Sequence, residues 1–240
     1  MTDLLFHIDS YLQEFNAEII GLAADEKAVI LNRTAFYPGG GGQPADNGYL
    51  NFNGERIAVK RAKRVGGEIL HYLEIIPDFQ VQGSKVQGQI DWEKRYQLMR
   101  THTAMHVLCG VIFRDYGASV TGGDMQPLKG RMDFEFETMR KELVKEIEEA
   151  VNFEIDQARE VSARILPRED AFQIPDLIRT KINLLPEGIT EVRVVEIEGL
   201  DIQADGGTHV KNTSEIGNIT IADYKSKGRI NKRIYLEISE

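Results

Sequence analysis

The sequence predicts an α+β protein, in which a small N-terminal β-barrel precedes a second domain with an antiparallel sheet and two long helices. Two observations lead to this fold class. Short alternating segments separated by turn residues fill residues 14–90, and at Asp91 the apolar spacing changes to that of a helix. Beyond that helix the predicted strands and helices do not alternate regularly, which favours α+β over a doubly wound sheet.

The predicted barrel consists of the segments EFNAEIIGLA, KAVILN, NGYLNF, ERIAVKRAKR, EILHYLEI and KVQGQID. Apolar and polar residues alternate in these segments, as in strands with one buried face. Turn residues separate them in PGGGGQPADNG, NFNGE, VGGE and VQGS, and such spacing favours a small barrel. We therefore predict a barrel domain over residues 1–88 and a second domain over residues 89–240.

Two helices are predicted in the second domain. The first begins at Asp91, a good N-cap, and ends at Gly117. Its apolar residues recur at helical spacing at Tyr96, Met99, Met105, Leu108 and Ile112. The second runs from about Thr138 to Arg159 and is amphipathic, with a strongly acidic side.

The other segments of the second domain predict strands and loops. ASVTGGDMQ and GRMDFEFE predict a loop and a strand, and VSARILPRED predicts a strand that breaks at Pro167 into a short helix. EVRVVEIEG and DIQA predict further strands. GNITIADYKSKGRINKRIYLEI predicts an antiparallel hairpin with its turn near Lys227 and Gly228.

The composition is that of a globular protein without a membrane segment. Hydrophobic residues make up 42% and charged residues 28% of the 240 residues, and no apolar run is long enough to span a bilayer. The first residues are acidic where a secretory leader is basic, which predicts a cytoplasmic protein. The single cysteine, Cys109, cannot form an internal disulfide and is expected to be a buried small hydrophobe.

The net charge of −9 argues against general nucleic-acid binding. Positive charge is nevertheless concentrated in two basic clusters. They comprise Lys60, Arg61, Lys63 and Arg64, and Lys225, Lys227, Arg229, Lys232 and Arg233. Each cluster is consistent with a solvated surface and with local contact to an RNA backbone, and the sequence leaves both interpretations open.

The motif HTAMH places His102 and His106 four residues apart on the first predicted helix. Residues at this spacing share a helix face, so the two imidazoles can chelate one metal ion. No Glu lies between them, so the motif is not that of the helical metalloproteases. Two polar histidines of the core would give the same pattern.

The motif DGGTH offers Asp205 and His209 on a tight glycine turn, where the backbone can bend close to a site. With His102 and His106 they supply three imidazoles and one carboxylate, which suits a catalytic zinc ion. A glycine turn with a surface histidine is the alternative.

The motif TAFYPGGGGQP contains the consecutive glycines Gly39 to Gly42. Because ordered glycines cost conformational entropy, we expect a reason for them, such as close approach to a substrate. A flexible linker is the alternative, and the flanking Phe36, Tyr37 and prolines argue against it. The motif lacks the Lys-Ser/Thr of a P-loop, and no nucleotide cofactor is expected.

In combination, LMRTHTAMHVL, QADGGTHVKNTSEIG and TAFYPGGGGQPADNG resemble motifs of the editing domain of alanyl-tRNA synthetase and of its free-standing relatives, the AlaX proteins. SKGRINKRIYLEI is similar to the C-terminal edge of that family, so the resemblance spans residues 15–238. The glycine-rich motif ahead of HxxxH is typical of the medium-length AlaX class. Nothing in the chain resembles an aminoacylation domain.

The resemblance implies a hydrolase that deacylates tRNA(Ala) mischarged with serine or glycine, with serine expected, and that uses one Zn²⁺ per chain. His102 and His106 match the HxxxH ligands, which are also the implied catalytic residues together with His209. His209 ends the family's CxxxH motif, and its usual Cys is replaced by Asp205. Asp205 then either ligates the metal or orients water. The implied substrate-binding residues are Thr34, Gly39, Gly40, Gly41, Gly42 and Gln43.

Besides a structural metal domain with a closed four-ligand site, which would unfold on chelation, two other functions stay open at this point. One is a zinc-dependent esterase or amidase for small molecules, whose activity would not depend on salt as that on an RNA substrate does. The other is a non-catalytic tRNA-binding module in which Asp205 has spoiled the metal site. The sequence does not decide whether zinc activates water or orients the substrate, and it does not decide the oligomeric state.

Overall fold

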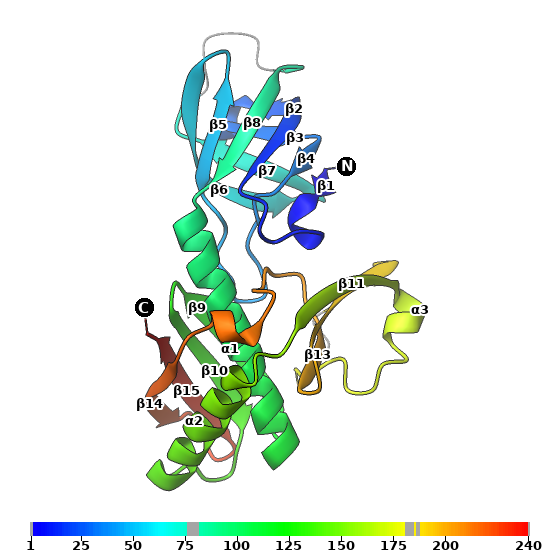
Figure 1. The fold of residues 1–240 in the computed structure, drawn as a ribbon. Coiled ribbons are helices and arrows are strands. Elements are labelled where there is room, and N and C mark those ends of the chain that lie inside the picture. Colours follow the sequence, from blue (N-terminus) through cyan, green and yellow to red (C-terminus); the bar gives the residue numbers. More distant parts are fainter. Residues whose placement is uncertain (1, 76–81, 181–184, 186–187, 240) are drawn as a thin grey trace. The chain divides into compact units, whose positions relative to one another are not determined.

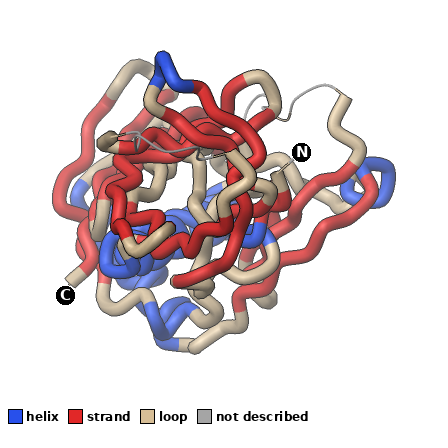
Figure 2. Tube along the Cα trace, turned by 90° about the horizontal axis from the view of Figure 1, so that it is seen from above, coloured by secondary structure: helices blue, strands red, loops and turns tan. Residues whose placement is uncertain are grey.

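The computed structural model describes residues 2–75, 82–180, 185 and 188–239, and it consists mainly of strands and loops (Figures 1 and 2). The chain forms two compact units, Met1–Tyr96 and Gln97–Glu240. A closed barrel, antiparallel sheets and two long helices confirm the predicted α+β class. The division into folding domains after residue 88 stays a prediction.

The first unit contains a closed barrel with the strand order β2-β3-β7-β6-β5-β8, and every neighbouring pair is antiparallel. The strands are β2 (Glu14–Ala23), β3 (Ala28–Leu31), β5 (Gly48–Phe52), β6 (Glu55–Val65), β7 (Glu68–Leu73) and β8 (Lys85–Ile90). Each of them lies in a segment that alternation predicted, except that β6 continues one residue further, to Val65. Two short strands, β1 (Asp3–Leu4) and β4 (Arg33–Thr34), pair in parallel and are too short to show an alternation pattern.

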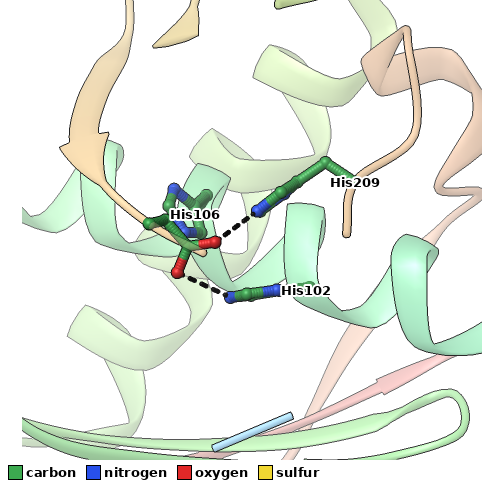
Figure 3. A group of neighbouring side chains, drawn as sticks. His102, His106 and His209 are labelled. Atoms are coloured by element: carbon green, nitrogen blue, oxygen red, sulfur yellow. Dashed lines mark hydrogen bonds and ion pairs between the residues drawn. The ribbon is translucent and has the colours of Figure 1, made fainter. Parts of the chain in front are cut away.

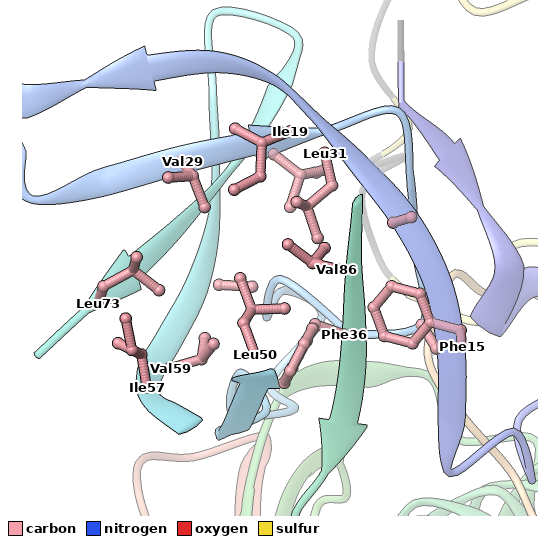
Figure 4. Close-up of a cluster of buried hydrophobic side chains, with 14 of the residues drawn as sticks. Phe15, Ile19, Val29, Leu31, Phe36, Leu50, Ile57, Val59, Leu73 and Val86 are labelled. Carbon is pink, nitrogen blue, oxygen red and sulfur yellow. The ribbon is translucent and has the colours of Figure 1, made fainter. Parts of the chain in front are cut away.

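Alternate side chains of the barrel strands fill its interior (Figure 4). On β2, Phe15 and Ile19 are buried while Glu14 and Glu18 are exposed. Gly88 on β8 makes room for the Phe15 ring, because a Cβ at this position would lie 2.3 Å from Phe15 Cε1. The pleat and one glycine therefore account for the packing of the largest side chains.

A buried ion pair joins the glycine-rich segment to the first helix within the same unit. The side chains of Arg95 and Asp46 are almost fully buried, and Arg95 Nε donates to Asp46 Oδ1 at 3.0 Å. The Arg95 guanidinium also donates to the carbonyls of Ser10 and Ala35, and the Tyr37 N–H donates to Asp46 Oδ2 at 2.6 Å. Each charged group thus has several partners, as buried charges require.

Helix α1 (Trp92–Tyr116) has the bounds that the sequence predicts. The Asp91 carboxylate accepts the Lys94 N–H at 3.4 Å, and the helix ends before Gly117, whose φ is +64°. From Leu98 to Ile112 nearly every side chain is buried, so this stretch is a central helix of the second unit. Cys109 is buried, as predicted.

The second unit contains a four-stranded antiparallel sheet of order β14-β15-β10-β9. Its strands are β9 (Val120–Gln126), β10 (Lys129–Glu135), β14 (Ile219–Ser226) and β15 (Asn231–Ile238). The predicted C-terminal hairpin is therefore confirmed, and β9 extends through glycines that we expected in a loop. Met105 of α1 packs against Gly130, where a Cβ would lie 2.9 Å from the Met105 sulfur.

Helix α2 (Lys141–Asp156) packs on β14 and is shorter than the predicted span at both ends. Arg140 has an extended backbone, and Ala158 has a φ of +52°, which stops the helix. A three-stranded sheet of order β11-β12-β13 follows (Figure 1). Its strands are β11 (Val161–Pro167), β12 (Glu191–Ile197) and β13 (Asp201–Ala204), and the short helix α3 (Arg168–Ala171) follows β11, all as predicted.

Short 3-10 helices complete the secondary structure: η1 (Leu5–His7), η2 (Ala24–Glu26) and η3 (Thr213–Glu215). Within the described ranges, no helix combines the length and the apolar character needed to cross a membrane.

We predict that Asp46→Ala lowers the free energy of unfolding of the full chain by about 3–5 kcal/mol, because it leaves the buried Arg95 without its carboxylate. Urea unfolding followed by circular dichroism measures this loss. The control is Glu74→Ala, which breaks an exposed ion pair with Lys60 at 3.7 Å and should cost less than about 1 kcal/mol. Equal losses in the two variants would contradict the role of the buried pair.

Candidate metal centre

Three histidines and one aspartate gather in the second unit. His102 and His106 project from one face of α1, and their ring centroids are 5.1 Å apart. His209 and Asp205 come from the loop after β13, and the potential ligand atoms of all four residues lie within 4.8 Å of one another. The structure thus brings together the residues that the two motifs singled out.

The Asp205 carboxylate lies between the imidazoles of His102 and His209, two of the three histidines that Figure 3 labels. Its Oδ1 is 3.0 Å from His209 Nε2, and its Oδ2 is 3.5 Å from His102 Nε2. The three histidines are buried, whereas the Asp205 side chain retains 15% exposure. Asp205 is therefore the most solvent-accessible member of the group.

Backbone contacts shape the loop that carries Asp205 and His209. The Gly207 N–H donates to Asp205 Oδ1 at 2.6 Å, which closes a tight turn. Arg193 on β12 donates from Nη1 to the carbonyls of Asp205 at 3.1 Å and Gly207 at 2.9 Å. These bonds fix the backbone on both sides of Gly206, and with it the direction of the Asp205 carboxylate.

Each histidine also has a second partner outside the group. His106 Nδ1 lies 3.1 Å from Asp201 Oδ2, His209 Nδ1 lies 3.2 Å from Thr103 Oγ1, and His102 is hydrogen-bonded to the backbone of Thr208. Thr103 donates its hydroxyl hydrogen to the Met99 carbonyl at 2.9 Å, so it accepts from His209. Such outer partners select the tautomer of an imidazole and leave its other nitrogen for a metal.

The electrostatics of His102, His209 and Asp205 favour the protonation states that metal binding needs. Burial lowers the pKa of His102 to about 4, against the opposing charge of Asp205. Burial and the neighbouring His102 lower the pKa of His209 well below its ordinary value. Burial disfavours ionisation of Asp205, but the adjacent histidines hold the pKa of its carboxyl well below the ordinary value.

His106 differs from the other two imidazoles. Burial lowers the pKa of His106, but the hydrogen bond and charge of Asp201 outweigh this effect and raise the pKa above its ordinary value. Neutral imidazoles with a charged carboxylate form a donor set that fits a divalent transition metal such as zinc.

Motif analysis missed the outer partners Asp201, Thr103 and Gln203. Asp201 and Gln203 lie in the short strand β13, and Thr103 lies inside HTAMH. Their roles arise from contacts between segments far apart in the sequence, so no local spacing identifies them. Thr103 becomes a partner of His209 only because the loop after β13 lies against α1.

The glycine-rich motif lies in the first unit, and its predicted role in substrate binding stays a prediction. Gly39, Gly40, Gly41 and Gly42 have φ values of +81°, +135°, +58° and +88°, in the region that other residues rarely adopt. The N–H groups and carbonyls of Gly40 and Gln43 bond to each other, and Tyr37 Oη donates to the Gly40 carbonyl at 2.9 Å. The segment is thus an ordered turn, and the linker alternative is wrong.

Thr34 is fully buried and makes a hydrogen bond with His71, which sequence analysis did not single out. His71 Nδ1 lies 3.2 Å from the Val29 carbonyl, so this nitrogen carries the proton. Burial lowers the pKa of His71 to about 4, and its neutral Nε2 accepts the Thr34 hydroxyl at 2.8 Å. Thr34 Oγ1 also accepts the Phe36 N–H at 3.1 Å.

Part of each basic cluster is used in local contacts. In the first unit, Arg61 lies over the Tyr72 ring. In the second, Arg233 pairs with Asp133 and Lys225 with Asp223. Lys232 donates to two backbone carbonyls. Lys63, Arg64, Lys227 and Arg229 are exposed, and they are the members of the clusters that suit contact with RNA.

Two family models match the chain. The model of class II tRNA synthetases (A) matches residues 7–94, and that of the threonyl and alanyl tRNA synthetase second additional domain matches residues 192–235. The second match contains Asp205 and His209 of the metal centre. A barrel followed by a region that matches this additional domain places the chain in the class of synthetase-related proteins.

Relatives narrow the class to one family. Alanyl-tRNA editing protein AlaX-M of Saccharolobus solfataricus is 42% identical over 99% of both chains, and that of Methanosarcina acetivorans is 39% identical over 99% of both. Alanine–tRNA ligase of Ignicoccus hospitalis is 40% identical over 92% of this chain and 24% of that protein. The chain belongs to the AlaX-M family of alanyl-tRNA editing proteins, and it is an aminoacyl-tRNA deacylase, a hydrolase of ester bonds.

We predict that His71 makes the stability of the chain fall as the pH falls. Its pKa is about 4 in the folded protein, against an ordinary value of 6.5, so the unfolded chain takes up the proton first on acidification. Between about pH 7 and pH 5 this loss amounts to about 2 kcal/mol. Urea unfolding of the wild type and of His71→Gln, which does not titrate, measures the difference. The same pH dependence in both proteins would contradict the buried neutral state of His71.

Proposed function

We propose that this chain removes serine from mischarged tRNA(Ala), and that it uses a zinc ion held by His102, His106, His209 and Asp205. The cluster of three imidazoles and a carboxylate, in a chain of the AlaX-M family, is the observation that carries the proposal. Glycine on the same tRNA is a second substrate to test. No nucleotide cofactor or membrane is part of the proposed reaction, and we place it in the cytoplasm.

The reaction is the hydrolysis of an ester. The oxygen of water attacks the carbonyl carbon of the amino acid, the bond from that carbon to the ribose oxygen breaks, and the ribose oxygen takes up a proton. A bound zinc ion supplies a Lewis acid that polarises water or the ester carbonyl. The imidazoles supply neutral nitrogen donors, and the Nδ1 atoms of His106 and His209 are bonded to Asp201 and Thr103.

Asp205 stands where the resemblance implies a cysteine. We propose that its carboxylate completes the donor set, since both of its oxygens already lie beside imidazoles. A carboxylate is a harder ligand than a thiolate, so this centre should bind zinc less tightly and accept other divalent ions more readily. The exposed side of Asp205 is the side from which water and the ester would approach.

Selectivity for serine is proposed to involve Thr34 and the turn from Gly39 to Gln43. Because Thr34 donates its hydroxyl hydrogen to His71 and accepts the Phe36 N–H, it keeps one lone pair with which to accept another hydrogen bond. A serine hydroxyl can donate to that lone pair, and an alanine methyl cannot. Thr34 is fully buried, so this contact requires the covering side chains to move.

We predict that the wild type deacylates serine-charged tRNA(Ala) much faster than alanine-charged tRNA(Ala), and that chelation abolishes the activity. His106→Ala should lower the rate by more than the roughly 10–100-fold that follows loss of an outer partner of a ligand. Release of radiolabelled amino acid under single-turnover conditions measures these rates. His7→Ala removes a histidine outside the cluster and should leave the rate unchanged.

Other outcomes favour the alternatives. If the wild type holds a metal but leaves both charged tRNAs intact, the substrate assignment is wrong and a small ester becomes the leading substrate. Binding of tRNA without turnover would instead indicate a non-catalytic module. Loss of the deacylation rate at high salt would support an RNA substrate.

We predict that Thr34→Val lowers the serine-to-alanine rate ratio by roughly fivefold to tenfold, the effect of losing one hydrogen bond. Thr34→Ser keeps the hydroxyl and should keep the ratio. Thr34→Val also leaves His71 Nε2 without its donor, so the ratio, and not the absolute rate, is the measured quantity. An unchanged ratio would assign Thr34 to the barrel structure alone.

A further inference from the structure

We propose that Asp201 is a positioning residue for the metal centre: its carboxylate fixes His106 in the orientation and tautomer of a metal ligand, and Arg179 and Gln203 hold that carboxylate in place. The proposal rests on the metal centre of the proposed function. Neither sequence motif contains Asp201, which is the first residue of β13.

The Asp201 side chain is fully buried and receives three donors. Its Oδ2 lies 3.1 Å from His106 Nδ1 and accepts from Gln203 Nε2 at 2.6 Å. Its Oδ1 accepts from Arg179 Nε at 3.3 Å. One carboxylate oxygen therefore faces the metal centre and the other faces a buried cation.

The chemistry of the carboxylate determines the direction of the bond to His106. An ionised carboxylate accepts hydrogen bonds and cannot donate, so His106 Nδ1 carries the proton. Nε2 of the same ring then keeps its lone pair for a metal ion. A carboxylate behind an imidazole also strengthens the ring as a donor, and Asp201 is such a carboxylate, 3.1 Å from His106 Nδ1.

Packing explains why Asp201 reaches this position. Gly110 lies one helical turn after His106 on the same face of α1. A Cβ at Gly110 would lie 2.9 Å from Leu200 Cγ and 3.0 Å from Asp201 Cβ. The absence of a side chain at Gly110 thus permits the start of β13 to approach the helix beside His106.

Arg179 lies beside Asp201. Its side chain is 8% exposed, and its guanidinium lies over the Phe113 ring, 3.8 Å from the centroid. Arg179 Nη1 has no hydrogen-bond partner among the described residues, so the guanidinium is held by Asp201 and the ring rather than by a wider network. Burying a cation costs free energy, and the principal partner of Arg179 is the Asp201 carboxylate. This is consistent with a role of Arg179 in holding Asp201.

The test compares two double variants that differ in one acceptor. Arg179→Met combined with Asp201→Asn, and Arg179→Met combined with Asp201→Leu, both remove the buried charges. The Asn oxygen can still accept from His106 Nδ1, whereas Leu cannot. Zinc affinity of the metal-free full chain is measured by competition with a chelating dye, and the visible spectrum of the cobalt-loaded protein reports the geometry of the ligands.

We predict that the Leu variant binds zinc roughly 10–100-fold more weakly than the Asn variant and has an altered cobalt spectrum. The Asn variant should stay within a few-fold of the wild type. Asp133→Asn is the control, because it disrupts a buried carboxylate that pairs with Arg233 and is not a member of the metal centre, and it should leave zinc affinity unchanged. If the Leu variant fails to fold, Asp201→Ala with Arg179→Met replaces it.

Equal zinc affinities of the folded Leu and Asn variants would overturn the positioning role while leaving the metal centre intact. Failure of the wild type itself to bind zinc or cobalt would overturn the metal centre, and with it both proposals. A loss of affinity in Asp133→Asn equal to that in the Leu variant would show that any buried charge in this unit has the same effect, and would also contradict the specific role of Asp201.

Discussion

The metal centre depends on the close approach of the start of β13 to helix α1. Two histidines on one helix face provide half of a donor set, and the other half has to come from elsewhere in the chain. Gly110 removes the side chain that would keep β13 away, and Asp201 then lies against His106. The loop that follows β13 brings Asp205 and His209 over the same helix face. One contact between two elements thus places both the ligands and their outer partners.

In the first unit, too, glycines permit a backbone path that other residues would not adopt. Gly39 to Gly42 all adopt positive φ, which gives a turn that other residues would strain. Such a turn needs support, and Asp46 supplies it by accepting the Tyr37 N–H while pairing with Arg95. In both units a glycine permits an unusual path of the backbone, and buried charged residues hold the chain on that path.

Patterns within single segments were sufficient to predict the barrel strands, α1 and the members of the histidine cluster, because alternation, helical spacing and capping are local properties. The ends of α2 differ from the amphipathic pattern because Arg140 and Ala158 leave helical geometry, which side-chain periodicity does not report. Asp201 and His71 were missed for a different reason: tertiary contacts alone make them partners of His106 and Thr34.

The proposed donor set contains nitrogen and oxygen but no sulfur. A cysteine ligand is open to oxidation by peroxide through sulfenic to higher acids, and an oxidised ligand releases its ion. Asp205 offers no such route. The one thiol of the chain, Cys109, is buried on the same helix, and burial raises its pKa well above the ordinary value, which keeps it protonated and unreactive. The centre should therefore keep its donors under oxidising conditions that would dismantle one with a cysteine ligand.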